Sequence, residues 1–260
     1  MKIASWNVNS LKVRLPQVLD WINLNQPDVL CLQETKQNNE NFPHNIFEQK
    51  GLFSYHNGQN TYNGVAIISN KELIDVQFDI SNFHDEQKRL ISGIYPNDEG
   101  PKFRVISAYI PNGQSLNSDK FEYKINWLKS FISSLQKKID GVENIITGDF
   151  NIAPTKLDCY DSKSWDGKIL VSPQEREYFD KLLNLGFIDT FREMNPYANE
   201  FSWWDYRIPF KRNLGMRIDH ILLSKNLLTF LKKAYIDKTT RTLERPSDHV
   251  PVVTELSLNP

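Results

Sequence analysis

The sequence is poor in the features that define several classes of protein. It has two cysteines in 260 residues, Cys31 and Cys159, and no spacing of cysteine and histidine that suits zinc. We therefore expect two reduced thiols rather than a disulfide scaffold. No apolar run approaches the ~18 residues of a membrane-spanning helix, and the N-terminus begins in a predicted strand without a signal-peptide pattern. We accordingly expect a cytoplasmic protein with no membrane partner.

A strong net charge is also missing. The 31 basic and 32 acidic residues give a formal charge of −1, so a nucleic-acid partner would have to be recognised by local clusters rather than by an overall positive field. Hydrophobic residues make up 40% of the chain, which is enough for a sizeable core. Because no repeat or low-complexity linker interrupts the sequence, we predict a single domain over residues 1–260.

The first third of the chain predicts a parallel strand pair followed by antiparallel strands. Residues 2–8 predict a strand, and apolar residues at helical spacing predict a helix that begins at Leu11, after Asn9 and Ser10 as possible caps. A second strand is predicted at 29–33, which makes a β-α-β unit and favours a parallel pair. Successive strands are then predicted as an antiparallel meander at 52–57, 64–69, 73–78, 90–95 and 103–110.

The rest of the chain repeats the alternation of helix and strand. The pattern predicts a helix over 120–139, and Ser172 and Pro173 open another that runs through Leu185. Further strands are predicted at 144–148, 218–223 and 250–256. A helix followed by a strand that ends in an acid occurs both at 11–34 and at 120–149. We predict an α/β fold of two packed sheets with helices outside.

Polar side chains lie at the ends of six apolar runs, where each predicted strand stops. Strands of one sandwich run side by side, so their ends can converge although the residues are far apart in the sequence. Carboxylates, amides, a phenol and an imidazole at one rim indicate a hydrolytic site that works with a hard metal ion. These residues are Asn7, Glu34, Tyr109, Asp149 with Asn151, Asp219, and Asp248 with His249.

The GDFN motif carries the sharpest of these signals. In extended backbone Asp149 and Asn151 would point to the same side, while Phe150 would point into the core and Gly148 would allow close backbone approach. A carboxylate beside an amide can hold an attacking water and orient the group that it attacks. The alternative is a simple Asx turn.

The other members have structural alternatives of their own. Asp219 paired with His249 would fix the imidazole tautomer and support a positive ring, although SDH alone is also a capping pattern. Glu34 could be a surface acid and Tyr109 a core tyrosine. For the remaining histidines a surface or strand position without a catalytic partner is expected: His44, His56, His84 and His220.

The segment FSWWDYRIPFKRNLGMR, residues 201–217, interleaves aromatic rings with cations. Aromatic faces can stack on sugars and bases, and cations can neutralise phosphates. Trp203 and Trp204 cannot both face inward in a strand, so we expect at least one to face a ligand or groove. The DNA-facing cations would be Arg207, Lys211 and Arg212; an ordinary loop anchored by its tryptophans is the alternative.

Nine motifs in chain order resemble those of the exonuclease III type of abasic-site endonuclease, within the endonuclease/exonuclease/phosphatase superfamily. They cover nearly the whole chain, and FSWWDYR and GMRID point to the DNA-repair branch. The resemblance implies a four-layer, DNase I-like α/β sandwich with two mixed sheets flanked by helices. The motifs are SWNVNSL, PDVLCLQETK, GVAIIS, SAYIPNG, GDFNIAPTKLD, GFIDTFR, FSWWDYR, GMRIDHILLS and RPSDHVPV.

The resemblance also implies a role for each matching residue. Glu34, with Asn7 and Asp248, matches the metal-binding set. Asp149 matches the aspartate that aligns or deprotonates water. The remaining catalytic matches are Tyr109, Asn151, Asp219 and His249, and the substrate-contacting matches are Arg89, Asn112, Trp203, Met216 and Ile218. Two departures, Asn9 where some relatives have aspartate and Met216 where some have an aromatic, concern the outer metal shell and the pocket.

Together these features predict a Mg²⁺-dependent phosphodiesterase, with Mn²⁺ as a substitute, that acts as a monomer on double-stranded DNA with abasic sites or blocked 3′ ends. Cleavage 5′ to the abasic site would leave a 3′ hydroxyl, and 3′-to-5′ exonuclease and 3′-phosphatase activities are implied. The alternatives are a superfamily enzyme acting on a different phosphate ester, or a non-catalytic DNA-damage-binding module.

Overall fold

The computed structural model describes residues 1–97, 100–137 and 141–258, and within them two six-stranded sheets pack face to face. The first sheet has the order β11-β12-β1-β2-β4-β3 and the second β5-β6-β7-β8-β10-β9. The first sheet contains β1 (Lys2–Asn7), β2 (Val29–Gln33), β3 (Phe53–Asn57), β4 (Val65–Ser69), β11 (Leu231–Ile236) and β12 (Val252–Leu256). The second contains β5 (Ile74–Phe78), β6 (Leu90–Tyr95), β7 (Lys102–Tyr109), β8 (Val142–Asp149), β9 (Phe187–Asp189) and β10 (Asp219–Ser224).

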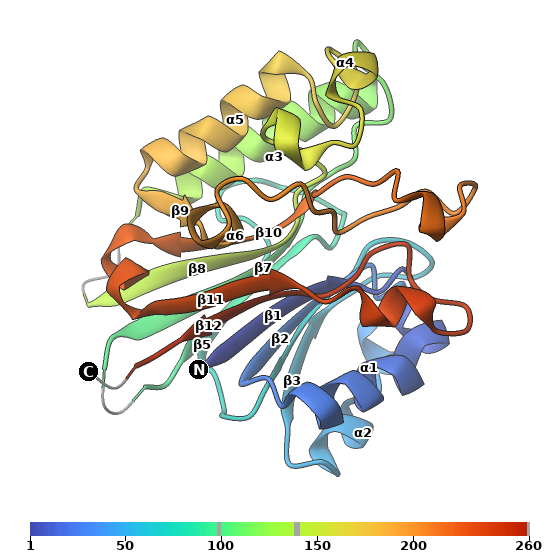
Figure 1. Ribbon diagram of the computed structural model, residues 1–260. Coiled ribbons are helices and arrows are strands. Elements are labelled where there is room, and N and C mark those ends of the chain that lie inside the picture. The colour runs from blue at the N-terminus through green and yellow to red at the C-terminus, as the bar shows by residue number, and fades with distance from the viewer. Residues whose placement is uncertain (98–99, 138–140, 259–260) are drawn as a thin grey trace.

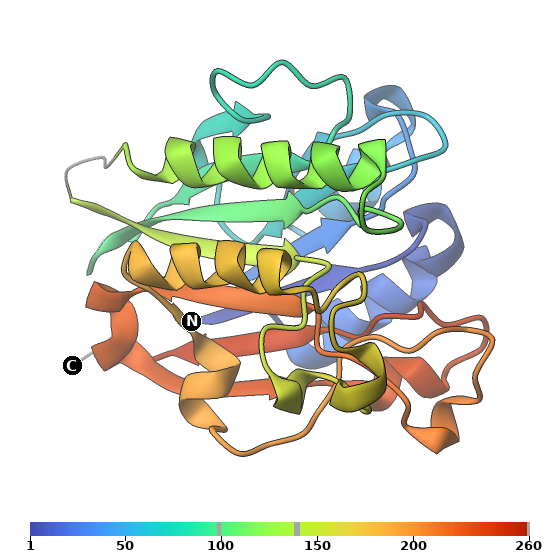
Figure 2. The same ribbon diagram turned by 90° about the horizontal axis from the view of Figure 1, so that it is seen from above.

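Helices cover the outer face of each sheet and complete the predicted four layers (Figure 1). The helices α3 (Asp119–Leu135) and α5 (Pro173–Asn184) lie side by side over the second sheet, as the view from above shows (Figure 2). The helices α1 (Leu11–Asn25) and α2 (His44–Glu48) lie outside the first sheet. The shorter helices are α4 (Ser162–Trp165) and α6 (Thr190–Met194), with 3-10 turns at Asn39–Asn41, Lys156–Asp158, Phe210–Arg212, Lys225–Phe230 and Lys238–Thr242.

Three clusters of buried apolar side chains fill the spaces between the four layers of helices and strands. One lies between the sheets and includes Ile67, Val105 and Ile221. The second joins the second sheet to α3 and α5, and the third joins the first sheet to α1. Burying both faces of both sheets explains why the central strands read as continuous apolar runs.

The predicted local pairings are confirmed, but the single meander is wrong. β1 and β2 are parallel, as the β-α-β pattern predicts. The five strands between residues 52 and 110 pair antiparallel, yet β3 and β4 belong to the first sheet and β5, β6 and β7 to the second. Hairpin signals describe neighbours in sequence, and they carry no information about where the chain leaves one sheet for the other. β9 and β11 were not predicted; β9 has three residues and β11 begins with a bulge at its lysines.

The helix starts differ in how they are stabilised. Ser172 caps α5 with a capping box that includes Glu175, and Pro173 occupies its first turn, as predicted. Ser10 precedes α1 at φ 93° and makes no side-chain cap, so that part of the prediction is wrong. α3 ends at Leu135, before the predicted limit, and positions 138 and 139 lie outside the described residues. In the described part of the chain, no helix combines the length and apolar character needed to span a bilayer.

The strand registers bring the polar residues of the sequence to one rim. Tyr109 lies beside Asp149 in the parallel pair of β7 and β8, and Asp219 lies opposite Asp149 in the antiparallel pair of β8 and β10. In the other sheet Asn7 ends β1 beside Gln33, which directly precedes Glu34. The predicted convergence of strand ends is therefore present in the fold.

Candidate active site

A compact cluster of three titratable side chains occupies this rim. Ligand atoms of Glu34, Asp149 and His249 lie within 4.8 Å of one another. The Asn7 amide donates to Glu34 Oε1 and to Asp149 Oδ2, in both cases at 2.9 Å. One amide thus bridges carboxylates from the two sheets, which sets their separation.

A hydrogen-bonded chain of two side chains, Asp219 and Ser202, supports His249. Its Nδ1 lies 2.8 Å from Asp219 Oδ2, and its Nε2 lies 3.7 Å from Asp149 Oδ2. Ser202 Oγ donates to the same Asp219 oxygen at 2.6 Å and accepts from the backbone N–H groups of Ile218 and Asp219. Ser202 was not predicted as a site residue, because the aromatic residues around it dominate the motif; only its place in FSWWDYR indicated the site.

The surroundings set the charge states of these groups. Burial alone would lower the pKa of His249, but the carboxylates of Asp219 and Asp149 outweigh it and raise the pKa to about 10. Burial raises the pKa of Asp149 to about 7, although His249 opposes this. Burial, together with the charges of Glu34 and Asp149, raises the pKa of Tyr109 well above its usual value. The imidazole is therefore positive, and the phenol is a neutral donor.

The GDFN turn is an Asx turn and part of the site at once. Asn151 N donates to Asp149 Oδ1 at 2.9 Å, and Asn151 has φ 51°, so the expected extended geometry is wrong there. Left-handed backbone is tolerated by asparagine, and it directs the Asn151 amide toward Asn112, whose Nδ2 donates to Asn151 Oδ1 at 2.9 Å. Phe150 is fully buried, as predicted. A Cβ on Gly148 would lie 1.8 Å from Ala108 O, which confirms the predicted close approach.

The donor set at the rim fits a hard divalent cation. Glu34 and Asp149 offer carboxylate oxygens, and such oxygens are the ligands that Mg²⁺ and related ions prefer. His249 belongs to the same cluster, but a protonated imidazole has no lone pair to bind a metal. Lys36 Nζ lies 2.9 Å from Glu34 Oε2, the oxygen that Asn7 does not contact, and its positive charge partly neutralises the carboxylate.

Asp248 lies outside the three-residue cluster. Its Oδ1 accepts from the Asn9 amide at 2.9 Å and its Oδ2 from the Trp203 indole at 3.0 Å. Asn9, which stands where some relatives have an acid, is thus the residue that connects Asp248 with the Lys36 ammonium. Any role of Asp248 toward a cation would be exerted from behind this amide.

The predicted phosphate-contacting arginine lies against the site tyrosine. The Arg89 guanidinium is 4.8 Å from the centre of the Tyr109 ring and donates to Tyr109 O at 3.3 Å. Gln87 Oε1 accepts from two of its nitrogens. Arg89 is therefore a fixed cation beside the phenol.

Of the three residues predicted to line a sugar pocket, Trp203 is the accessible one. Trp203 and Met216 exchange backbone hydrogen bonds of 2.9 Å, so they are neighbours as expected. Trp203 is half-buried, whereas Met216 and Ile218 are buried behind it in an apolar cluster. Trp204 faces the core, which confirms that the two tryptophans point in different directions.

The three cations predicted to face DNA are not members of the cluster of Glu34, Asp149 and His249. Arg207, Lys211 and Arg212 are exposed on the loop that precedes Gly215. Arg207 is paired with Asp205. All three side chains are therefore open to solvent.

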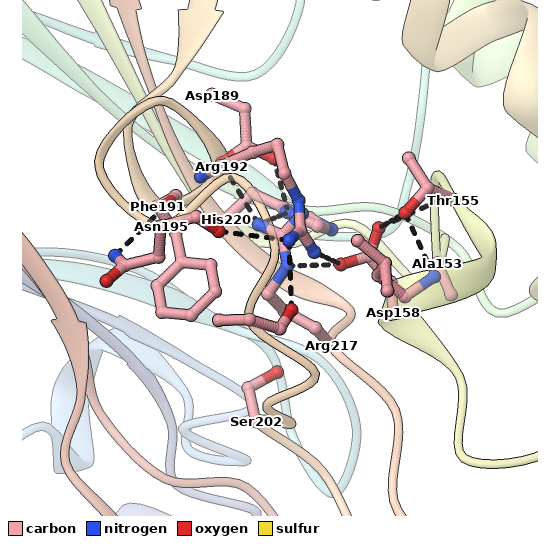
Figure 3. A network of polar contacts seen from close by, with 12 residues as sticks. Ala153, Thr155, Asp158, Asp189, Phe191, Arg192, Asn195, Ser202, Arg217 and His220 are labelled. Carbon is pink, nitrogen blue, oxygen red and sulfur yellow. Dashed lines mark hydrogen bonds and ion pairs between the residues drawn. The ribbon is translucent and has the colours of Figure 1, made fainter.

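A buried polar network surrounds Arg217, which lies between Met216 and Ile218 in the sequence (Figure 3). Arg217 Nε donates to Asp158 Oδ1 at 2.7 Å, and its other nitrogens donate to both oxygens of Asp189. His220 Nε2 lies 2.9 Å from Ile152 O, so it carries the proton, and Nδ1 accepts from Arg217 at 3.0 Å. The expected strand position of His220 is confirmed, and its neighbours Arg217 and Asp189 belong to the buried network rather than to the cluster of Glu34, Asp149 and His249.

Comparison with known proteins decides the family. The sequence matches the Endonuclease/Exonuclease/phosphatase family over residues 4–249. The chain belongs to this family. Exodeoxyribonuclease III of Haemophilus influenzae is 38% identical over 98% of the chain and 99% of its own length.

Solved structures of family members have the same fold. A 3′ phosphatase, NExo from Neisseria, bound to a product DNA hairpin, superposes with a TM-score of 0.94 at 42% identity and covers 99% of both chains. An AP endonuclease from Archaeoglobus fulgidus gives a TM-score of 0.93 at 35% identity, over 98% of this chain and 99% of its own. The predicted family and the predicted DNase I-like sandwich are both confirmed.

Proposed function

We propose that this family member is a Mg²⁺-dependent phosphodiesterase that cleaves duplex DNA 5′ to abasic sites and leaves a 3′ hydroxyl. The observation that carries the proposal is the cluster of Glu34, Asp149 and His249, with the Asn7 amide bridging its two carboxylates. The names of the relatives support the choice of substrate, since they include an exodeoxyribonuclease III, an AP endonuclease and a 3′ phosphatase. The proposal includes 3′-to-5′ exonuclease and 3′-phosphatase activities.

Each side chain of the rim has a role that follows from its position. Glu34, with Asn7 and, from behind Asn9, Asp248, would hold the cation. A bound Mg²⁺ supplies charge that offsets the negative charge growing on the phosphate and the leaving oxygen. Asp149 accepts hydrogen bonds from Asn7 and Asn151 N, and this fixes its carboxylate for holding the attacking water.

The donors of the rim face the phosphate. The positive ring of His249, oriented by Asp219, donates from Nε2 to a phosphate oxygen. The neutral Tyr109 phenol and the amides of Asn151 and Asn112 donate to the same group, and Arg89 beside the phenol contacts a phosphate of the strand. Preorganised donors of this kind stabilise charge without reorganisation in the reaction.

An abasic nucleotide is easily extruded because it has no base to unstack. Trp203 would pack on the bare sugar, with Met216 and Ile218 behind it limiting the depth of the pocket. Arg207, Lys211 and Arg212 would contact the flanking duplex. The proposal also treats residues 1–260 as one domain that acts as a monomer, which light scattering after gel filtration would test.

The deciding experiment uses a duplex oligonucleotide with one abasic site, assayed with Mg²⁺, with Mn²⁺ and with EDTA. We expect cleavage 5′ to the site with either metal and none with EDTA. Asp149→Asn is expected to bind the duplex without cleaving it. Metal-independent binding without cleavage by the wild type would favour a damage-binding module instead, and hydrolysis of a non-nucleic phosphate ester alone would favour the other enzyme class.

A further inference from the structure

A buried ion pair lies directly beneath the two amides of the site. Lys124 on α3 and Glu175 on α5 have no exposed side-chain surface, and Lys124 Nζ lies 2.5 Å from Glu175 Oε1. The two helices run side by side over the second sheet (Figure 2). A buried pair is seldom better for stability than apolar residues of the same size, so its presence calls for another explanation.

The Lys124 ammonium has three hydrogens and three acceptors. Besides Glu175, it donates to Asn151 O at 2.7 Å and to Asn112 O at 3.3 Å. These two carbonyls belong to the residues whose side-chain amides bond to each other at the rim. An apolar side chain at position 124 would leave both carbonyls without this donor.

The stem of the lysine supports the same loop. A Cβ built on Gly113 would lie 3.1 Å from Lys124 Cδ, so the turn after Asn112 packs directly on the methylenes. Asn151 has φ 51°, a left-handed conformation that needs support from its surroundings, whereas glycine adopts the φ of +86° at Gly113 without strain. The lysine touches both segments at once, which couples their positions.

Glu175 anchors the ammonium to the loop on the other side. Its carboxylate accepts from Leu170 N at 3.1 Å, and from Ser172 N and Oγ at 3.0 and 2.7 Å. Leu170 O in turn accepts from Ala153 N, two residues beyond Asn151. Both oxygens of the Glu175 carboxylate thus accept hydrogen bonds, and the carboxylate cannot move without shifting the segment that follows GDFN.

We infer that Lys124 is a positioning residue for the reaction, which sets the distance and orientation of the Asn112 and Asn151 amides through their backbone carbonyls. The inference rests on the proposed function, because it assigns a role toward amides that would contact the phosphate. Lys124 itself is buried and touches no substrate atom. Its effect should therefore appear in kcat and disappear when the amides through which it acts are removed.

The test is a double-mutant cycle on the abasic duplex. Lys124→Met with Glu175→Gln removes both charges and keeps the volume. We expect kcat to fall by about 10- to 100-fold, as small misplacements of reacting groups do, with KM changed less than about threefold. In a background that carries both Asn112→Ala and Asn151→Ala the same pair of substitutions should lower kcat by less than about threefold. If the Lys124→Met, Glu175→Gln pair lowered kcat by the same factor with and without the amides, its effect would be a general structural one, and the inference would be overturned.

Two further variants keep the result interpretable. Lys124→Arg retains a charge opposite Glu175 but moves the donor nitrogens, so its kcat loss should also vanish in the background with both amides removed; a loss that persists there would overturn the inference. Arg104→Met with Asp75→Asn is the matched control, because Arg104 is a buried cation paired with an acid five residues before Tyr109 on β7. It should leave kcat unchanged.

The wild-type assay separates the two proposals. Absence of cleavage by the wild type would overturn the proposed function and, with it, the role of Lys124. Wild-type cleavage together with an unchanged kcat in the Lys124→Met, Glu175→Gln variant would overturn the positioning role alone.

Discussion

Gln33 of the first sheet donates a hydrogen bond from Nε2 to Ser107 Oγ of the second sheet at 3.1 Å. Both side chains are fully buried between the sheets. The same amide nitrogen donates to Ser5 Oγ, also at 3.1 Å. This polar contact lies directly before Glu34 and two residues before Tyr109, so it ties the two halves of the site together where the sheets meet.

Removal of this contact should weaken both stability and catalysis. Gln33→Met keeps the volume but removes the hydrogen bonds of Gln33 to Ser5 Oγ and its donation to Ser107 Oγ, which still donates to Leu32 O; the buried Ser5 hydroxyl left unpaired should cost about 1–3 kcal/mol of unfolding free energy. We expect a lower kcat as well, because this contact helps to hold the strand before Glu34 against the strand that ends at Tyr109, and the Asn7 amide would then be left to link the two sheets at the rim. Urea unfolding and steady-state kinetics measure the two effects. Unchanged stability would show that the Ser5 hydroxyl finds another partner.

The Asp219–His249 pair should matter through charge rather than through shape. Asp219→Asn keeps the geometry but removes the carboxylate that holds the imidazole positive, so kcat should fall by roughly 10²-fold or more. Ser202→Ala removes one donor to Asp219 and should have a smaller effect in the same direction. Cleavage of the abasic duplex under saturating conditions checks both. Equal losses from the two variants would contradict this order.

Trp203 should determine preference for the abasic site. Trp203→Ala removes the accessible wall of the pocket and is expected to reduce the ratio of cleavage at abasic over intact duplex. Trp203→Phe keeps an aromatic face and loses only the hydrogen bond to Asp248, so it should retain most of the preference. Competition between the two duplexes gives the ratio directly. If Trp203→Ala left the preference for abasic over intact duplex unchanged, Trp203 would not form part of a pocket for the abasic sugar.

The network around Arg217 predicts a loss of stability in mild acid. Burial, followed by the charge of Arg217, lowers the pKa of His220 to about 4 from 6.5. Between pH 6.5 and pH 4, His220 is protonated in the unfolded chain but stays neutral in the folded protein. The free energy of unfolding therefore falls as the pH drops from 6.5 to 4. The shift corresponds to a contribution on the order of 3 kcal/mol over this range.

His220→Gln isolates this contribution. The glutamine at position 220 has no ionisable group. The slope of unfolding free energy against pH between 4 and 6.5 should therefore be smaller than in the wild type by up to about 1.4 kcal/mol per pH unit. Chemical denaturation at several pH values measures the slope. An identical slope in wild type and variant would show that other groups cause the acid sensitivity.

Much of the fold and of the site was readable from the chain. Apolar runs located most central strands, and the capping box of Ser172 and Glu175 located α5. The polar residues at the ends of those runs predicted the members of the cluster at the rim, which are Glu34, Asp149 and His249. The errors have physical causes: β9 is too short for a period to be seen, and the meander is divided because sheet membership depends on which apolar face finds which partner.

The sequence by itself determined which residues could meet, since strand ends with polar side chains must gather at the rim of a sandwich. Only the tertiary structure decided what supports them. Ser202 behind Asp219, Lys124 beneath the amides and Arg217 behind the pocket wall are joined to their partners across 17 to 59 positions of sequence. Their hydrogen bonds and charge states arise from burial and distance, and neither quantity exists until the two sheets and their helices have packed.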